Sequence, residues 1–211
     1  MDFELTILPE EQEIIDNILE DQENLDALFR EVVLSKKFST ERFEDFKIVM
    51  KIAVHYPERI YSYWDTLVLL QKNKKIDSLY ISMNLIAAII KADHQNRFEE
   101  IIDDYFALLY DSRISYASIT ALCAGYIAEH NERYRDGITE YLLSLQNNEL
   151  IKVKHPELLK GSAIVSFDRY FENSGNQEAI LDFVRSMQNS KSPKAKKAAR
   201  NFLKKRKIDF Q

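Results

Sequence analysis

Glycine and proline are scarce in this chain, and that scarcity limits the folds it can adopt. The 211 residues include only four glycines and four prolines. β-Hairpin turns and phosphate-binding loops both depend on such residues, so we expect few of either. The chain also lacks a Gly-rich phosphate loop, a Cys-x-x-Cys pair, a His-Glu-x-x-His helix and a Gly-x-Ser-x-Gly turn. These absences argue against the common enzyme classes, and we expect no catalysis, no metal and no cofactor.

Cysteine is nearly absent, long apolar runs are lacking, and we expect no export signal. The single cysteine, Cys123, cannot form a disulfide within the chain, which fits a reducing compartment. The first eleven residues contain four acids and no base, the reverse of a secretory signal. The longest apolar run, residues 85–90, is far shorter than the roughly 20 residues that cross a bilayer. We therefore expect a cytoplasmic protein with no membrane partner.

Helical periodicity dominates what is present. Leu79, Met83, Ile86 and Ile90 recur at steps of three and four, which places them in one apolar stripe on a helix. Strand-like alternation is absent. The pattern predicts an all-α protein with helices over residues 9–20, 24–35, 40–55, 58–72, 76–92, 97–110, 115–130, 134–146, 157–173, 177–188 and 193–205.

The helices repeat along the sequence. Residues 92–109 placed over 128–145, a shift of 36, give six identities in 18 positions. The identical pairs are Ala92 and Ala128, His94 and His130, Arg97 and Arg133, Ile102 and Ile138, Tyr105 and Tyr141, and Leu109 and Leu145. A third copy lies upstream, with Ala53, His55, Arg59, Ile60 and Trp64 at the corresponding positions. A period near 36 to 39 with two helices per unit is typical of helical solenoids.

These repeats resemble the HEAT family of helical repeat proteins. The closest local match is residues 192–199, in which a capping serine and a proline precede alanines, similar to the first helix of that family. The resemblance implies a right-handed α-α superhelix of helix pairs, also called an armadillo-type fold. We interpret residues 1–38 as an N-terminal helical cap and residues 39–211 as the repeats with a basic capping helix, one domain in all.

Charge is concentrated at the C-terminal end. Residues 191–207 contain nine bases and no acid, whereas the rest of the chain has a net charge of −14. One interpretation is a capping helix with a charged outer face. Another is a nucleic-acid patch formed by Lys194, Lys197, Arg200, Lys204, Lys205 and Arg206. The opposite charges of the end and the body could also favour head-to-tail self-association.

The resemblance by itself does not fix the function, because HEAT-like folds serve as scaffolds, transport factors and occasional enzymes. Our first hypothesis is a non-catalytic scaffold whose second helices form a concave surface for a protein partner. The residues expected to face outward there are Tyr61, Asp65, Glu99, Asp103, Arg135 and Thr139. A HEAT-like family of DNA glycosylases uses tryptophans and an aspartate in a basic groove, for which Trp64 and Asp65 would be the counterparts. This chain has only one tryptophan, and it is acidic outside its C-terminal segment, so glycosylase activity is our third hypothesis, after nucleic-acid binding.

Three histidines occupy equivalent positions in the repeats. His55, His94 and His130 are each one repeat apart, so neighbouring copies should be separated by about 10 Å, the distance between packed helices. We therefore expect structural roles in turns or caps rather than a metal site. Cys123 is equivalent to Ala87 and lies in an apolar helix, which predicts a core residue.

Overall fold

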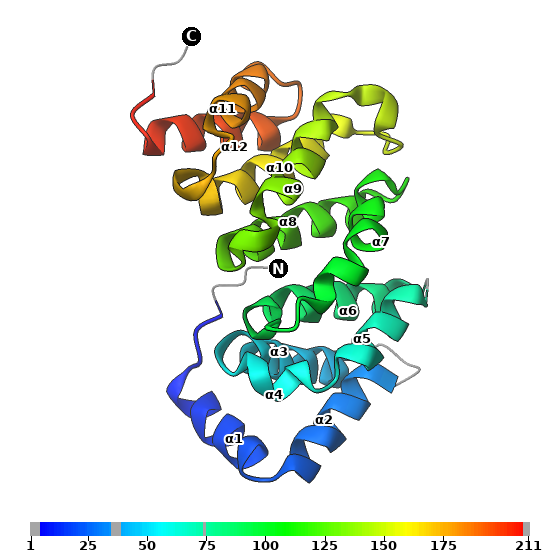
Figure 1. Ribbon diagram of the computed structural model, residues 1–211. Helices are drawn as coiled ribbons and strands as arrows, with labels where there is room; N and C mark the ends of the chain where they lie inside the picture. Colours follow the sequence, from blue (N-terminus) through cyan, green and yellow to red (C-terminus); the bar gives the residue numbers. More distant parts are fainter. Residues whose placement is uncertain (1–4, 35–38, 74, 209–211) are drawn as a thin grey trace. The chain divides into compact units, whose positions relative to one another are not determined.

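The protein is all-helical, as its sequence predicts. The computed structural model describes residues 5–34, 39–73 and 75–208, and in these ranges it contains twelve α-helices, six short 3-10 helices and no strand (Figure 1). Three predicted helices, over residues 9–20, 40–55 and 193–205, have the bounds that the sequence indicated. The chain divides into two compact units, Met1–Arg97 and Phe98–Gln211, whereas the sequence interpretation counted one domain.

The first unit contains six α-helices among its described residues. They are α1 (Pro9–Glu20), α2 (Gln22–Leu34), α3 (Thr40–His55), α4 (Pro57–Tyr61), α5 (Trp64–Lys72) and α6 (Ile76–Ala88), followed by the 3-10 turn η1 (Ile90–Ala92). The 3-10 turn η2 (Arg97–Glu100) begins at the last residue of this unit. Helix α3 packs against α2, α4 and α6, which places it at the centre of the unit.

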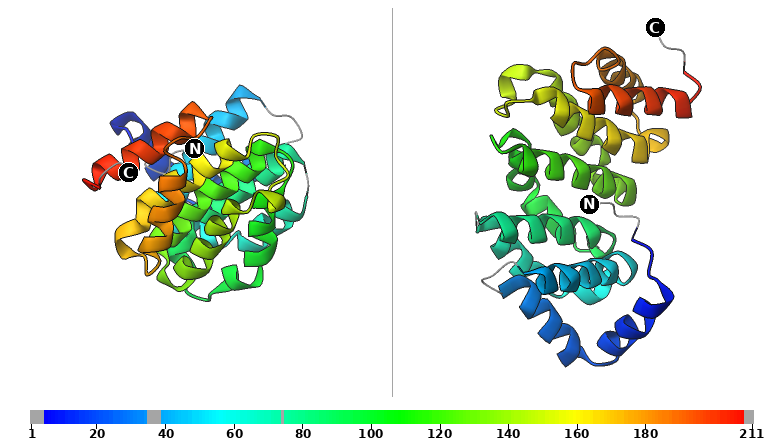
Figure 2. Two further views of the ribbon diagram at one scale, coloured as in Figure 1. Left: turned by 90° about the horizontal axis from the view of Figure 1, so that it is seen from above. Right: turned by 180° about the vertical axis from the view of Figure 1, so that it is seen from behind.

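The second unit also contains six α-helices in its described part. They are α7 (Ile102–Phe106), α8 (Ile114–His130), α9 (Glu132–Leu143), α10 (Pro156–Tyr170), α11 (Gln177–Ser186) and α12 (Pro193–Lys205). Four 3-10 turns accompany them: η3 (Ala107–Tyr110), η4 (Ser144–Gln146), η5 (Asn148–Leu150) and η6 (Phe171–Asn173). Helix α10 lies between α8 and α12, and Figure 2 shows the same stack from two further sides.

Polar contacts attach the N-terminal helices to the helices that follow. The Glu11 carboxylate accepts the backbone N–H of Leu8 at 2.8 Å, which caps α1, and it also forms an ion pair with Lys51 of α3. The Arg42 Nε donates to the carbonyl of Val32 at 2.8 Å. The bonds of the buried Lys51 and Arg42 side chains satisfy donors that would otherwise destabilise the fold.

Two predicted helices are interrupted in the structure. The helix expected over 58–72 breaks between α4 and α5, where Tyr63 has φ −94° and ψ 11°. The helix expected over 97–110 breaks at Ile101, which has φ −121° and ψ 0°. The break allows Phe98 to pack edge-on against Tyr105, with ring centroids 5.3 Å apart. Because packing supplies most of the stability of a helix in a protein, it overrides a continuous apolar period here.

Small residues allow the helices of the second unit to approach closely. A Cβ at Gly125 of α8 would lie 2.6 Å from the Cα of Ser166 on α10. A Cβ at Gly161 of α10 would lie 2.9 Å from the Cα of Ala195 on α12. Both distances are too short for a side chain, so only glycine permits these crossings.

The C-terminal ends of the same three helices are joined by arginines. Arg169 near the end of α10 pairs with Glu129 of α8 at 2.7 Å. Arg206, which follows α12, bonds Asp168 of α10 and pairs with Glu172 at 3.0 Å. Cations at these ends also interact favourably with the helix dipole. The contacts hold α8, α10 and α12 in register.

Candidate interaction surfaces

Residues predicted to bind a partner are largely engaged in contacts between consecutive repeats. Arg97 forms an ion pair with Asp65, and Arg133, one repeat later, pairs with Glu99 at 2.7 Å. Asp103 accepts a hydrogen bond from the Tyr141 hydroxyl. Each contact reaches back between 32 and 38 residues to an acid of an earlier helix. Arg97 and Arg133 therefore both pair with an acid of the preceding repeat, although Asp65 and Glu99 are not at equivalent repeat positions.

The three acids of the predicted protein-binding set remain exposed despite these contacts. The side chains of Asp65 and Glu99 are 82% and 59% exposed, and Asp103 is also exposed. Their carboxylates can therefore still meet a partner, because surface ion pairs of this kind are weak and exchange easily.

Of the other three residues of that set, Thr139 contradicts the predicted orientation, and Tyr61 and Arg135 are only partly exposed. Thr139 was expected to face outward, but it is completely buried, and its hydroxyl lies 3.0 Å from that of Tyr170. The outward orientation inferred from the sequence was wrong at this position, because Thr139 packs against Tyr170, whereas its repeat equivalent Asp103 is exposed. Tyr61 is half-buried and donates to Asp93 at 2.8 Å. Arg135 is half-buried and donates to the carbonyl of Ala128 at 2.9 Å.

Exposed acids cover the second helices of the second unit. We use the term acidic face for the seven exposed carboxylates of η2, α7 and α9: Glu99, Glu100, Asp103, Asp104, Glu132, Asp136 and Glu140. Arg133, 54% exposed, is the one exposed base on these three elements. A surface with this charge attracts basic ligands and repels nucleic acid.

Four exposed bases form a row on one side of α12. Ser192 caps this helix by accepting the N–H of Ala195, and Ala195, Ala199, Phe202 and Leu203 are buried on its inner side. The bases on the opposite side are Lys194, Lys197, Arg200 and Lys204, all exposed, and we call them the basic row. None of the four forms an ion pair with another described residue. The row spans eleven residues, or about 15 Å of helix.

Two bases of the predicted nucleic-acid patch are already paired within the protein. The Arg206 side chain is only 7% exposed and stacks on the Phe202 ring, with its guanidinium carbon 3.8 Å from the centroid. It cannot reach an external phosphate, so its inclusion in the patch was wrong. Lys205 is exposed but pairs with Asp168 at 3.2 Å. The sequence did not reveal these contacts because Asp168 lies 37 and 38 residues away.

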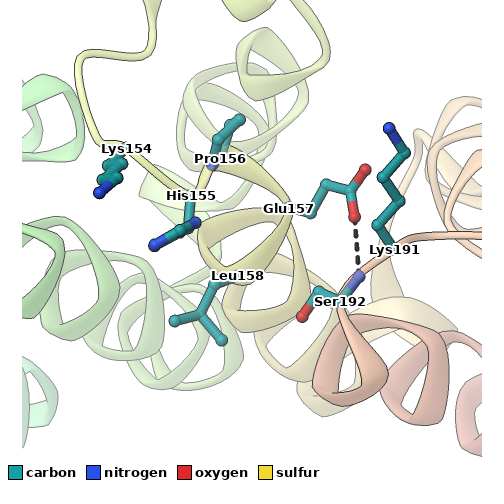
Figure 3. A pocket seen from close by; sticks show the side chains of 7 residues that line it. All are labelled: Lys154, His155, Pro156, Glu157, Leu158, Lys191 and Ser192. Atoms are coloured by element: carbon teal, nitrogen blue, oxygen red, sulfur yellow. Dashed lines mark hydrogen bonds between the residues drawn. The ribbon is translucent and has the colours of Figure 1, made fainter.

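A pocket of about 380 Å³ lies where the N-terminal ends of α10 and α12 meet. Lys154, His155, Pro156, Glu157, Leu158, Lys191 and Ser192 line it (Figure 3). Glu157 accepts the Ser190 hydroxyl at 2.6 Å and the Ser192 N–H at 2.8 Å. These bonds, the Ser190 hydroxyl above all, lower the pKa of the Glu157 carboxyl below its usual value. The protein thus supplies its own anion to the start of α12.

The two residues considered for chemistry, Cys123 and Trp64, are buried in the core. Cys123 is buried, as predicted, and burial raises the pKa of its thiol to about 12, which suppresses the reactive thiolate. Trp64 is 1% exposed, so it cannot stack on a base as the glycosylase hypothesis requires. In the described ranges, no group of three or more His, Cys, Asp or Glu side chains is placed to hold a metal ion.

The repeat histidines have separate partners. A ring nitrogen of His55 lies 2.6 Å from the Leu5 carbonyl, and one of His94 lies 3.0 Å from a Glu58 carboxylate oxygen. A ring nitrogen of His130 lies 2.9 Å from the Tyr126 carbonyl, one turn earlier in α8. These contacts fit the turn and capping roles expected of them.

Comparisons with protein-family models, with curated proteins and with solved structures gave no match. The features above therefore come from this chain alone. Within the described residues, none of the helices combines the length and the apolar character needed to cross a bilayer.

Proposed function

We propose that the protein is a non-catalytic binding scaffold in which HEAT-like helix pairs stack as a right-handed α-α superhelix. In this proposal residues 1–38 cap the array and residues 39–211 contain the repeats. Support comes from Arg97 and Arg133, which occupy equivalent repeat positions and each pair with an acid of the preceding repeat, and from the ordered stacking of α8, α10 and α12. Solenoids of this kind expose long surfaces built from successive helices.

The acidic face is the observation that carries the proposal. Seven exposed carboxylates with one exposed base form a field that favours a lysine- and arginine-rich protein segment. Complementary charge of this kind increases the rate of association and selects the partner more than it adds affinity. We therefore infer a basic, extended protein segment as the ligand, and we expect binding that weakens as the salt concentration rises.

Charge reversal on the acidic face tests this function. Glu100 and Asp104 are exposed and four residues apart, so E100K/D104K reverses two charges without removing the pairs of Glu99 and Asp103. The probe is a displayed library of lysine- and arginine-rich peptides, selected on the wild-type chain. We expect roughly tenfold weaker binding of the selected peptides to E100K/D104K, corresponding to about 1.4 kcal/mol.

A matched control separates the site from the net charge. The variant E23K/E31K makes the same charge change on α2, where both residues are exposed. It should bind the selected peptides as the wild type does. Equal weakening by both variants, or no selection of any basic peptide by the wild type, would refute the assignment to the acidic face.

Nucleic-acid binding through the basic row is the second candidate. The observation in its favour is that Lys194, Lys197, Arg200 and Lys204 lie together on one exposed side of α12. Four phosphate contacts predict that the logarithm of the affinity for duplex DNA falls with the logarithm of the salt concentration, with a slope of about −3.6. The variant K197E/R200E should lose this binding, and unchanged binding would eliminate the patch.

A further inference from the structure

Helix α1 has a row of acids with the same spacing as the basic row of α12. Its exposed acids are Glu10, Glu13, Asp16 and Glu20. The intervals are three, three and four residues, and the intervals from Lys194 to Lys204 on α12 are the same. Both helices begin with proline, Pro9 and Pro193, so each row also starts at the same place in its helix. We call the four carboxylates of α1 the acidic row.

Helix geometry places each row on one side of its helix. Successive residues turn by about 100°, so intervals of three, three and four keep all four side chains within about 120° of each other. The opposite side of α1 carries the buried Ile15, and that of α12 carries the buried Ala199 and Phe202. Each row is therefore about 15 Å long and directed away from the core of its own unit.

The two rows have no ion-pair partners of their own. None of the eight side chains forms an ion pair with another described residue of its own unit, and α1 contains no basic residue at all. Asp16 accepts a hydrogen bond from the neutral Gln12 side chain at 2.8 Å, which leaves its charge in place. Four acids and four bases with matching spacing are thus presented to the surroundings by two helices of the same chain.

We propose that the chain associates with itself, with α12 of one copy lying along α1 of another. The side-by-side approach of two rows of equal length brings four carboxylates against four cations. The contact is heterologous, because the two copies contribute different surfaces. The acidic face fits the basic row less well, because Glu132, Asp136 and Glu140 on α9 follow intervals of four and four. This inference is independent of the proposed protein-binding function.

Sedimentation equilibrium of the full chain gives the first test. Exposed charges interact over about 30 Å at 0.01 M salt but over much less than 10 Å at 0.5 M. At the lower salt concentration we expect a weight-average mass above the 24.8 kDa of the monomer, increasing with protein concentration. At the higher salt concentration we expect 24.8 kDa. A monomer at all concentrations in both salts would overturn the proposal.

Charge exchange gives the decisive test. The variants E13K/D16K and K197E/R200E each reverse the middle of one row and leave the ends, which interact with the helix dipoles, unchanged. Each variant alone should associate at least roughly tenfold more weakly than the wild type. Their equimolar mixture should regain association, as should one chain with all four substitutions. Failure of both combinations to regain it, with each variant folded by circular dichroism, would overturn the pairing.

Two further variants control for net charge and for misfolding. The variant D136K/E140K makes the same charge change on α9 as E13K/D16K makes on α1, and it should leave self-association unchanged. If D136K/E140K abolished self-association, the contact would belong to the acidic face instead of α1. If E13K/D16K does not fold, E13Q/D16N removes the charges with less perturbation and should also weaken association. If the basic row bound only nucleic acid, neither α1 variant would change the association state of the chain. That result would contradict self-association.

Discussion

Glycine at the helix crossings shows how single residues determine the packing of the second unit. The backbone of α8 approaches Ser166 so closely at Gly125 that even a methyl group has no room. Gly137 in α9 has the opposite surroundings, because a Cβ there would meet nothing within 4 Å. The same amino acid is therefore required at one site and dispensable at the other.

Alanine substitutions at these two glycines should have opposite effects on stability. G125A should lower the free energy of unfolding by about 1 to 3 kcal/mol, because the added methyl forces α8 and α10 apart. G137A should raise it by about 0.5 to 1 kcal/mol, because alanine loses less entropy in a helix. Urea unfolding of both variants measures the difference. Equal effects would mean that the close approach of α8 and α10 is not maintained in solution.

At the scale of helices, the start of α12 depends on a carboxylate from another element. Glu157 lies in the first turn of α10, yet it accepts hydrogen bonds from Ser190 and Ser192 before α12 begins. Hydrogen bonds to the charged form, led by that of the Ser190 hydroxyl, lower the pKa of its carboxyl below the usual value. The docking of α12 on α10 is thus linked to the ionisation of a single residue.

This linkage predicts a pH-dependent effect of E157Q. A carboxyl whose pKa is lowered by folding stabilises the protein above its unfolded pKa, and this contribution is lost as the pH falls through the folded pKa. The wild type should therefore be more stable than E157Q at pH 7, and the difference should shrink below about pH 4.5. Urea unfolding at pH 7 and pH 3 measures it. A difference that stays constant with pH would exclude the carboxylate as the cause.

At the scale of the whole molecule, the division after Arg97 predicts separate responses to core substitutions. Phe167 of α10 is fully buried and packs edge-on against Phe183 at 5.4 Å. F167A should destabilise the second unit by about 3 to 5 kcal/mol, because it leaves a cavity. Hydrogen exchange should then show faster exchange of amides in the second unit and little change in the first. Equal acceleration in both units would indicate that they open as one.

The sequence by itself determined the helical class and most helix positions. Scarce glycine and proline together with apolar residues at steps of three and four leave few alternatives, so α1, α3 and α12 have their predicted bounds. The burial of Cys123 and Trp64 could also be predicted, because their repeat equivalents are apolar. These features depend on local periodicity, which a single sequence contains in full.

Only the tertiary structure decided which surface residues are available to a partner. Thr139 and Arg206 were assigned to binding surfaces, but they are buried through contacts with Tyr170, Phe202 and Asp168. Those partners lie four residues away in one case and more than 30 in the others, and only the folding of the chain brings the distant ones close. Helix period identifies the side of a helix that faces the core, whereas the depth of burial at its margin depends on the neighbouring helix.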